Sequence, residues 1–369
     1  MTNVQTKPDE ILNQMEYPIV DLSLYLNDPD KSSKDCQLVA DLLHKYGFLC
    51  VKDPRVDDGL NDRFIDMLEK YYEQSDELKA KDIRKEVFYQ VGLTPGFVEQ
   101  ARDRCDMIAK FNETEKPLTI CPPDFDNKSR FFWRIGERPS NSEFPELHAD
   151  PVIPENFPEW KATMDNWGTL MLATVNTIAE MCARGFHMPY DTFTSLMKYG
   201  SNLLAPTGSN LGQFGQKGTI LAGFHSDISF LTIHGRARFP GLFVWTREGK
   251  RLPVKVPHGC LLLQAGQQFE RLTGGQVLAG FHEVVVSEQT VRAIEEASKA
   301  GRSLWRVSST MFTHIATDHI LQPLGSFANP ETIKKYPPIK AGAQVIAELA
   351  AVKMAKTLQV DNELLVNAY

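Results

Sequence analysis

The segment GFHSDISFLTI, residues 223–233, contains the pattern that decides the predicted fold and the predicted site. His225 and Asp227 are separated by one residue in a run that is typical of a β-strand. Because side chains at positions i and i+2 of a strand point to the same face, both can approach one metal ion. A second histidine, His282, lies in a later strand-like run, residues 277–286, which a folded sheet can bring alongside the first.

Two histidines and one carboxylate on one side of a metal ion are the ligand set of non-haem Fe(II) sites, in which the opposite positions stay open for a co-substrate and O₂. We therefore expect His225, Asp227 and His282 to bind Fe(II) and to form the catalytic centre. The alternative for His225 is a surface histidine beside an aspartate that caps a helix. The flanking strand pattern and the later histidine favour the metal site.

His148 and Asp150 have the same spacing, and they show that one His-x-Asp pattern is weak support for a metal site. They lie between two prolines in a segment without a strand pattern, so we do not expect them to bind a metal. We expect the remaining histidines to be structural or solvated: His44, His187, His234, His258, His314 and His319.

Arg306 and Ser308 form a second i, i+2 pair, in the strand-like run at residues 304–312. A buried guanidinium matches the two oxygens of a carboxylate, and a neighbouring hydroxyl adds one more hydrogen-bond donor. We therefore expect this pair to bind the distal carboxylate of 2-oxoglutarate as a co-substrate. The alternative is an ordinary surface arginine on a strand, and the pattern upstream favours the clamp.

Between residues 200 and 315, short apolar runs alternate with Gly, Pro and Asn, which is typical of a jelly-roll sandwich or barrel. Helical stripes precede this region and one follows it. We predict a mainly β fold with flanking helices and a double-stranded β-helix (jelly-roll) core. The predicted parts are a disordered tail (1–16), a mixed α/β N-terminal region that packs on the core (17–130), an irregular substrate-facing segment with a long central helix (131–200), the Fe(II)/2-oxoglutarate core (201–320) and a C-terminal helical segment (321–369).

The composition is that of a globular protein, since 42% of the 369 residues are hydrophobic and 24% are charged. The net charge of −7 and the lack of a basic patch with interleaved aromatics argue against a nucleic-acid partner. No apolar run is long enough to span a bilayer, and the polar N-terminal residues do not form a signal peptide. We expect a cytoplasmic monomer that acts on a small-molecule substrate, with no nucleic acid and no membrane as partner.

The six cysteines contain no CxxC pair, and several lie in apolar runs. This pattern favours reduced, buried cysteines in a cytosolic protein over a zinc site or a disulfide framework. The cysteines are Cys36, Cys50, Cys105, Cys121, Cys182 and Cys260.

Most of the chain, from residue 17 to about 320, resembles the isopenicillin N synthase-like branch of the 2-oxoglutarate/Fe(II)-dependent oxygenases. The His-x-Asp motif, the distal histidine and the Arg-x-Ser motif together carry the resemblance. Five stretches add to it: residues 18–22 resemble the family's IPVIDLS strand, 46–48 its wGFf turn, 152–158 the segment before its central helix, 223–233 its gaHtDasllTl motif and 272–275 its lTnG motif.

The resemblance implies a jelly-roll core in which His225, Asp227 and His282 hold Fe(II). It implies that 2-oxoglutarate chelates the iron through its keto acid, while Arg306 and Ser308 hold its other carboxylate. Oxidative decarboxylation with O₂ then gives succinate, CO₂ and a ferryl species, which hydroxylates, desaturates or cyclises the substrate. Here the iron carries the difficult chemistry, and the protein orients the reactants and excludes water.

Two alternatives stay open. An oxidase like isopenicillin N synthase has the same fold but uses no 2-oxoglutarate, and its Arg-x-Ser pair binds the carboxylate of the substrate. A metal-free jelly-roll binding protein is the alternative from another class, and three ligands able to converge argue against it.

Four positions depart from the family pattern. Ala205 stands where the family often has a tyrosine that helps to bind the acid, and Gly266-Gln267 replaces a Gly-Asp pair. Glu283 replaces an arginine after the distal histidine. Residues 288–303 look like an inserted helix ahead of the Arg-x-Ser pair.

Substrate contacts are expected in the aromatic stretch around residues 131–134. The candidates are Phe132, Trp133 and Arg134, of which Arg134 can meet an acidic substrate. The alternative for this stretch is loop packing and a solvated arginine. Phe230, three residues past Asp227, is expected on the opposite face of its strand and in the core.

Overall fold

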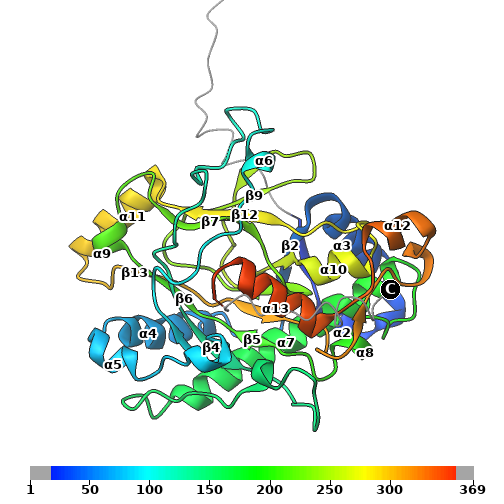
Figure 1. Cartoon of the computed structure of the whole chain (residues 1–369), viewed down its shortest axis with the longest axis horizontal. Coiled ribbons are helices and arrows are strands. Elements are labelled where there is room, and N and C mark those ends of the chain that lie inside the picture. The colour runs from blue at the N-terminus through cyan, green and yellow to red at the C-terminus, as the bar shows by residue number, and fades with distance from the viewer. Residues whose placement is uncertain (1–17, 355–369) are drawn as a thin grey trace, which may run out of the picture.

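Two β-sheets supply the residues of the predicted site (Figure 1). The structure is a computed structural model that describes residues 18–354, so the predicted tail at 1–16 lies outside the described residues, as do residues 355–369. In spatial order, the larger sheet consists of β1 (Ile19–Asp21), β2 (Phe48–Lys52), β11 (Leu261–Ala265), β8 (Leu231–His234), β14 (Met311–Thr313), β5 (Leu203–Leu204), β4 (Ser129–Arg134), β6 (Thr207–Asn210) and β13 (Trp305–Ser308), with β3 (Gly92–Thr94) paired to β4. The smaller sheet consists of β10 (Arg251–Pro253), β9 (Leu242–Trp245), β12 (Phe281–Val285) and β7 (Ile220–Ser226).

Helices flank these sheets, which confirms the predicted mainly β jelly-roll fold (Figure 1). The long helix α7 contacts β8 and β14 of the larger sheet, and α3 and α4 pack on α7. The C-terminal helix α13 packs on side chains of β4, β5 and β14. The helices are α2 (Ser23–Asn27), α3 (Ser33–Tyr46), α4 (Leu60–Tyr72), α5 (Asp76–Ala80), α6 (Cys105–Ile108), α7 (Trp160–Gly185), α8 (Thr194–Met197), α9 (Leu211–Phe214), α10 (Gln267–Leu272), α11 (Glu288–Lys299), α12 (Pro330–Lys335) and α13 (Ala341–Ala351); a further pair of short strands, β15 (Ile320–Leu321) and β16 (Ile339–Lys340), lies beside α13.

The local sequence explains the main helices. Helix α3 ends at Gly47, whose φ of 71° is left-handed and suits glycine, and buried β2 follows at once. The apolar stripe of α7, which includes Met171 and Ile178, is fully buried in the main core. Phe230 is also fully buried there, as the strand alternation predicted.

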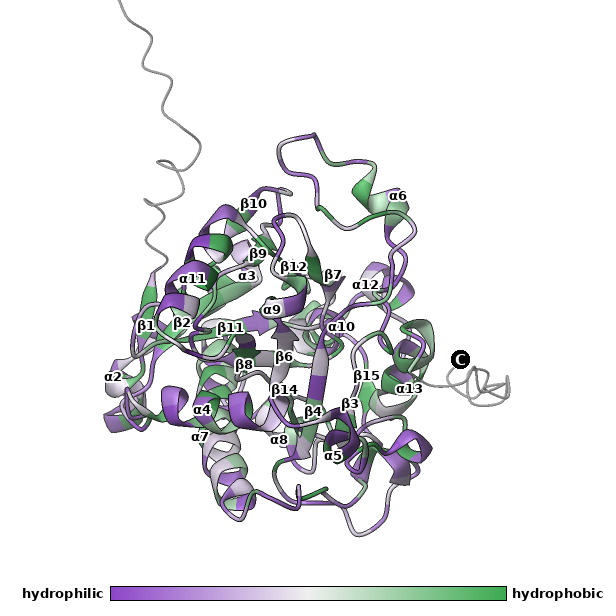
Figure 2. Ribbon diagram, turned by 90° about the vertical axis from the view of Figure 1, so that its left-hand side faces the viewer, coloured by the Kyte–Doolittle hydropathy of each residue, from purple (hydrophilic) through white to green (hydrophobic). Residues whose placement is uncertain are grey.

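The insertion at residues 288–303 is a helix, α11, as predicted. Ser287 and Thr290 form a capping box at its start, in which each hydroxyl accepts a hydrogen bond from the other residue's backbone N–H. Hydrophilic and hydrophobic residues alternate along α11 (Figure 2), and its apolar face packs on Leu221 and Val286 of the smaller sheet region. The insertion is therefore a packed element rather than a loose loop.

The predicted strand run at 304–312 is interrupted. β13 pairs with β6, whereas β14 pairs with β5 and β8, so the chain changes neighbours between Ser308 and Met311. The larger sheet also includes β1, β2 and part of β4 from the predicted N-terminal region. That region therefore contributes strands to the core sheet as well as packing on it.

The expectation that all six cysteines are reduced is wrong for Cys105 and Cys121, which form a disulfide. Their sequence separation of 16 gives no hint of the pairing, because the fold of the segment between them brings their Cα atoms to 5.6 Å. The other four cysteines are free and buried, as expected. Among residues 18–354, no helix combines the length and the apolar character needed to cross a membrane.

Candidate metal centre

His225, Asp227 and His282 converge where β7 and β12 run side by side. The two histidines are partners in the antiparallel register of these strands, and Asp227 directly follows β7. The Nε2 atom of each histidine lies 3.7 Å from Oδ1 of Asp227. One ligand atom from each of the three residues lies within 4.8 Å of the others. The structure therefore brings the predicted ligand set together.

Hydrogen bonds orient all three side chains. Nδ1 of His225 lies 2.6 Å from the carbonyl oxygen of Gly223, and Nδ1 of His282 lies 3.1 Å from that of Gly280. A carbonyl oxygen only accepts, so each Nδ1 donates and each Nε2 keeps a lone pair. The hydroxyl of Thr232 donates to Oδ2 of Asp227 at 2.6 Å, which leaves Oδ1 free to bind. Such outer contacts are typical of metal sites, and this donor set fits Fe(II).

The charge states also suit a metal. Burial, together with the neighbouring His282 and Lys128, lowers the pKa of His225 to about 3. Burial would raise the pKa of Asp227, but His282 and His225 hold it below its ordinary value. At neutral pH His225 is therefore neutral and Asp227 ionised, which are the forms that bind a metal.

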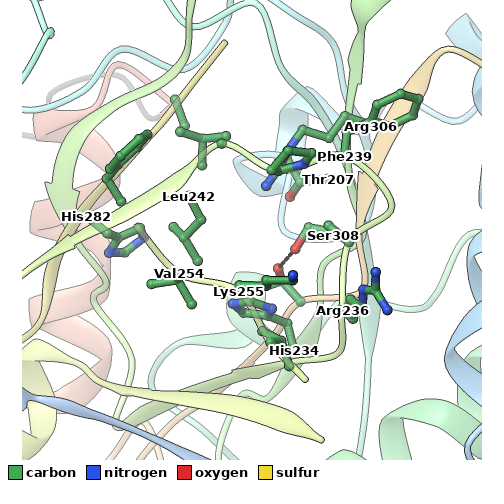
Figure 3. A pocket seen from close by; sticks show the side chains of 18 of the residues that line it. Thr207, His234, Arg236, Phe239, Leu242, Val254, Lys255, His282, Arg306 and Ser308 are labelled. Carbon is green, nitrogen blue, oxygen red and sulfur yellow. Dashed lines mark hydrogen bonds between the residues drawn. The ribbon is translucent and has the colours of Figure 1, made fainter. Parts of the chain in front are cut away.

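A cavity of about 1050 Å³ extends from the converging ligands between the two sheets (Figure 3). Arg306 and Ser308 of β13 line it, together with Thr310, whose hydroxyl is hydrogen-bonded to that of Ser308. Arg306 is only 7% exposed, and burial lowers its pKa to about 10, so it stays charged at neutral pH.

Arg306 has no counter-ion among the residues that the structure describes. Its guanidinium makes no ion pair and no hydrogen bond within residues 18–354, and its Nε is buried without a partner. A buried, unpaired charge is costly, and an anion that enters the cavity removes that cost. The geometry of Arg306 is therefore that of an anion-binding residue.

A second, smaller cavity of about 90 Å³ adjoins His225 and Asp227. Helix α13 covers it, and Phe132, Phe312 and the buried His314 line it. His225 and Asp227 thus border both the large cavity that contains Arg306 and a small one with a mainly apolar surface, whereas His282 lines the large cavity alone.

The structure separates the three predicted substrate residues. Phe132 lines the smaller cavity. Strand alternation turns Trp133 to the opposite face, where its Nε1 donates to Asp165 at 2.9 Å. Arg134 is buried and donates to the backbone carbonyls of Ile135, Asn202 and Glu137. Neither Trp133 nor Arg134 lines either of these two cavities, and substrate contact by these residues stays a prediction.

His148 and Asp150, the sequence's second His-x-Asp pair, do not converge. Nε2 of His148 lies 3.1 Å from the hydroxyl oxygen of Thr317, whereas Asp150 forms an exposed ion pair with Arg138. Two histidines without a predicted role are buried beside the site: His234 lines the larger cavity and His314 the smaller.

Sequence patterns missed a buried cluster of charges beside His225. Lys128, only 3% exposed in its side chain, pairs with Glu99 at 2.9 Å and with Asp126. Arg130 pairs with the other oxygen of Glu99 at 3.0 Å. Asp126 accepts a hydrogen bond at 2.9 Å from the N–H of Gly223, the residue whose carbonyl orients His225. The cluster therefore supports the position of a metal-ligand side chain.

We expect Glu99→Gln to destabilise the protein by about 3 kcal/mol or more, because it leaves two buried cations without their shared partner. Burial alone would raise the pKa of Glu99, but Arg130 and Lys128 hold it at about 2. This folded-state pKa lies below the ordinary 4.5. The stabilisation by ionised Glu99 is therefore complete above pH 4.5 and is lost as the pH falls towards 2. Urea unfolding against pH measures both effects.

The matched control is Glu155→Gln, which breaks the exposed pair with Lys81 and should cost below about 1 kcal/mol. Equal losses for the two variants would show that the buried cluster contributes no more than a surface pair.

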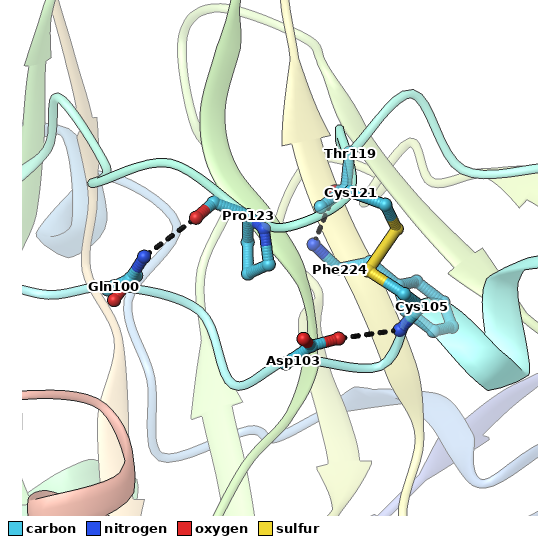
Figure 4. The surroundings of a disulfide bond; sticks show 7 residues. All are labelled: Gln100, Asp103, Cys105, Thr119, Cys121, Pro123 and Phe224. Carbon is cyan, nitrogen blue, oxygen red and sulfur yellow. Dashed lines mark hydrogen bonds between the residues drawn. A yellow bond between two sulfur atoms is a disulfide. The ribbon is translucent and has the colours of Figure 1, made fainter.

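The residues that depart from the family pattern make specific contacts in the structure. Glu283, fully buried, accepts hydrogen bonds from the N–H groups of Leu118 and Thr119 and pairs with Arg251 at 3.0 Å. The hydroxyl of Thr119 in turn accepts from the N–H of Phe224, next to His225 (Figure 4). Glu283 therefore fixes the loop that lies against β7.

The disulfide closes the same loop. It joins Cys105, at the start of α6, to Cys121, two residues past Thr119 (Figure 4).

Gln267, which lines the smaller cavity, donates its backbone N–H to the carbonyl of Asp227. Ala205 is fully buried in the cluster that α13 covers.

Residues 209–315 match the model of a family described as the 2OG-Fe(II) oxygenase superfamily. This family name contains two of the cofactors expected from the sequence, Fe(II) and 2-oxoglutarate, and O₂ is the usual co-substrate, which confirms the predicted cofactors at the level of the family. A search of curated proteins finds no significant match.

Solved structures share the fold over most of the chain. A putative 2OG-Fe(II) oxygenase family protein from Caulobacter crescentus has a TM-score of 0.72 at 23% identity, covering 92% of this chain and 99% of its own. A full-length Neurospora crassa protein in complex with alpha-KG and thymine gives 0.70 at 17% identity, covering 91% and 96%. A dioxygenase for auxin oxidation in rice gives 0.63 at 16% identity, covering 91% and 95%.

The matched segment contains the three converging ligands and the buried Arg306 with Ser308. The stretch of this chain that holds these residues therefore matches the model of the 2OG-Fe(II) oxygenase superfamily, within a fold that the solved structures share.

Proposed function

We propose that the protein is a non-haem Fe(II), 2-oxoglutarate-dependent dioxygenase of the isopenicillin N synthase-like type. It would hydroxylate, desaturate or cyclise a small-molecule substrate, with release of succinate and CO₂. The observation that carries the proposal is the unpaired, buried Arg306 in the same cavity as the converging ligands. A metal with open positions and an anion-binding residue in one cavity are the two elements that a chelating dicarboxylate requires.

The residues have separate roles in this proposal. His225, Asp227 and His282 would hold Fe(II), which supplies the oxidative chemistry when bound. Arg306 and Ser308 would hold the distal carboxylate of 2-oxoglutarate in the larger cavity. The smaller cavity, with Phe132 and the side chains beneath α13, would take the substrate and exclude water from it.

The size and apolar lining of the smaller cavity support a small-molecule substrate. Thymine is bound in the Neurospora crassa structure, and JA together with 2OG and Fe in that of JOX2, which covers 93% of this chain with a TM-score of 0.62. A monomeric state and a cytoplasmic location stay predictions.

An oxidase without 2-oxoglutarate is the second candidate. Ala205 favours it, because this position lacks the tyrosine that often helps to bind the co-substrate. In that case Arg306 would bind the carboxylate of the substrate, which would then occupy the larger cavity.

Oxygen uptake distinguishes the two candidates. With Fe(II) and a panel of small apolar molecules, we expect O₂ consumption to require 2-oxoglutarate and to yield an equal amount of succinate. Uptake of O₂ that continues when 2-oxoglutarate is omitted would support the oxidase instead. A purified protein that binds no iron at all would leave only a metal-free binding protein.

A further inference from the structure

The larger cavity has a strongly positive lining within a chain of net charge −7. Seven Lys and Arg residues line it, against one carboxylate, the metal-ligand Asp227. Three of these cations are neutralised by buried partners. Lys128 and Arg130 pair with Glu99, and Arg238 pairs at 2.7 Å with Glu69.

The other four cations form no ion pair within the described part of the chain. Arg306 is the buried one, and Arg236, Lys255 and Arg292 are exposed. Arg236 follows β8, Lys255 follows β10 and Arg292 lies on the inserted helix α11. Three separate elements thus place uncompensated charge around the cavity that contains Arg306 (Figure 3 labels Arg236 and Lys255).

The unpaired cations run from the solvent towards the interior of the larger cavity. The exposed cations meet solvent, and the buried, unpartnered Arg306 lies within the same cavity. All three exposed cations line the larger cavity, and none of them lines the smaller one. A positively lined cleft raises the local concentration of anions and speeds their association by about 10- to 1000-fold.

We propose that Arg236, Lys255 and Arg292 form an anion-capture site at an entrance of the larger cavity, where a dicarboxylate dianion is collected before it reaches Arg306. The inference rests on the proposed function in one respect, because it takes this dianion to be 2-oxoglutarate. It assigns a role to the insertion at residues 288–303, since α11 supplies Arg292.

Stopped-flow mixing of 2-oxoglutarate with the anaerobic Fe(II)-loaded protein tests the inference. The visible charge-transfer absorbance of the iron chelate reports association. In the variant Arg236→Gln/Lys255→Gln/Arg292→Gln, we expect the association rate at low ionic strength to fall about 10-fold and its dependence on salt to flatten. The final absorbance at saturating 2-oxoglutarate should stay unchanged, because the iron ligands and Arg306 are intact.

Two matched variants serve as controls. Lys34→Gln/Lys85→Gln/Lys334→Gln removes three exposed cations that line none of the described cavities, and should leave the rate unchanged. Arg236→Lys/Lys255→Arg/Arg292→Lys keeps the charges and should also keep the rate. An equal loss of rate in both glutamine variants, or no loss in either, would overturn the capture site. Absence of the band in the parental protein would remove the proposed function, and this inference with it.

Discussion

His225→Ala and Asp227→Ala are each expected to abolish Fe(II)-dependent turnover and to lower Fe(II) affinity by more than about 100-fold. The basis is that loss of an outer contact of a metal ligand already costs about 10- to 100-fold, and these residues would contact the metal itself. Their ligand atoms point at one another because Gly223, Gly280 and Thr232 orient them. Metal content after dialysis and Fe(II) titration by calorimetry measure the effect.

The sequence offers a matched control. Asp150→Ala removes the carboxylate of the other His-x-Asp pair, which lies in an exposed ion pair with Arg138. We expect it to leave iron binding and turnover unchanged. Retained iron affinity and activity in either His225→Ala or Asp227→Ala would rule out the metal centre.

Arg306→Met is expected to raise the 2-oxoglutarate concentration required for half-saturation by about 30-fold or more, with iron binding nearly unchanged. Truncation of one partner of a buried charge pair costs about 2–5 kcal/mol, and each 1.4 kcal/mol is about tenfold in affinity. The 2-oxoglutarate concentration for half-saturation is measured once by succinate formation and once by direct binding.

The stability of Arg306→Met shows whether Arg306 binds a ligand or stabilises the fold. Since Arg306 is buried and forms no ion pair within residues 18–354, its replacement by an apolar side chain should leave stability unchanged or raise it in the absence of 2-oxoglutarate. Arg238→Met is the matched comparison: it breaks ion pairs with Asp66 and Glu69 and should destabilise the protein. A similar loss of stability in Arg306→Met would contradict the assignment of Arg306 as a ligand-binding residue.

The shared direction of His225 and Asp227 could be predicted because strand alternation is a local rule, whereas the place of His282 beside them depends on the pairing of β12 with β7 and was expected from the family resemblance. Two residues at i and i+2 share a face whatever the rest of the chain does, and the same rule placed Phe230 in the core. The rule also gave Arg306 and Ser308 a common direction. The fold class followed from the spacing of short apolar runs.

Features that depend on contacts distant in sequence could not be predicted. Lys128 and Glu99 lie in an irregular stretch, and only the folded loop shows that they are buried together beside His225. The pairing of Cys105 with Cys121 depends on the same loop. Arg134 was assigned to the substrate by its charge, but its neighbours' carbonyl groups hold it inside the protein.

The most direct test of the central claim is an anaerobic titration of the protein with Fe(II) and then with 2-oxoglutarate, recorded as visible absorbance. We expect a metal-to-ligand charge-transfer band that saturates with one equivalent of 2-oxoglutarate and that, at the same concentration, is lost in Arg306→Met. Stoichiometric binding of iron with no such band at any concentration of 2-oxoglutarate would contradict it and favour an oxidase in which Arg306 binds the substrate.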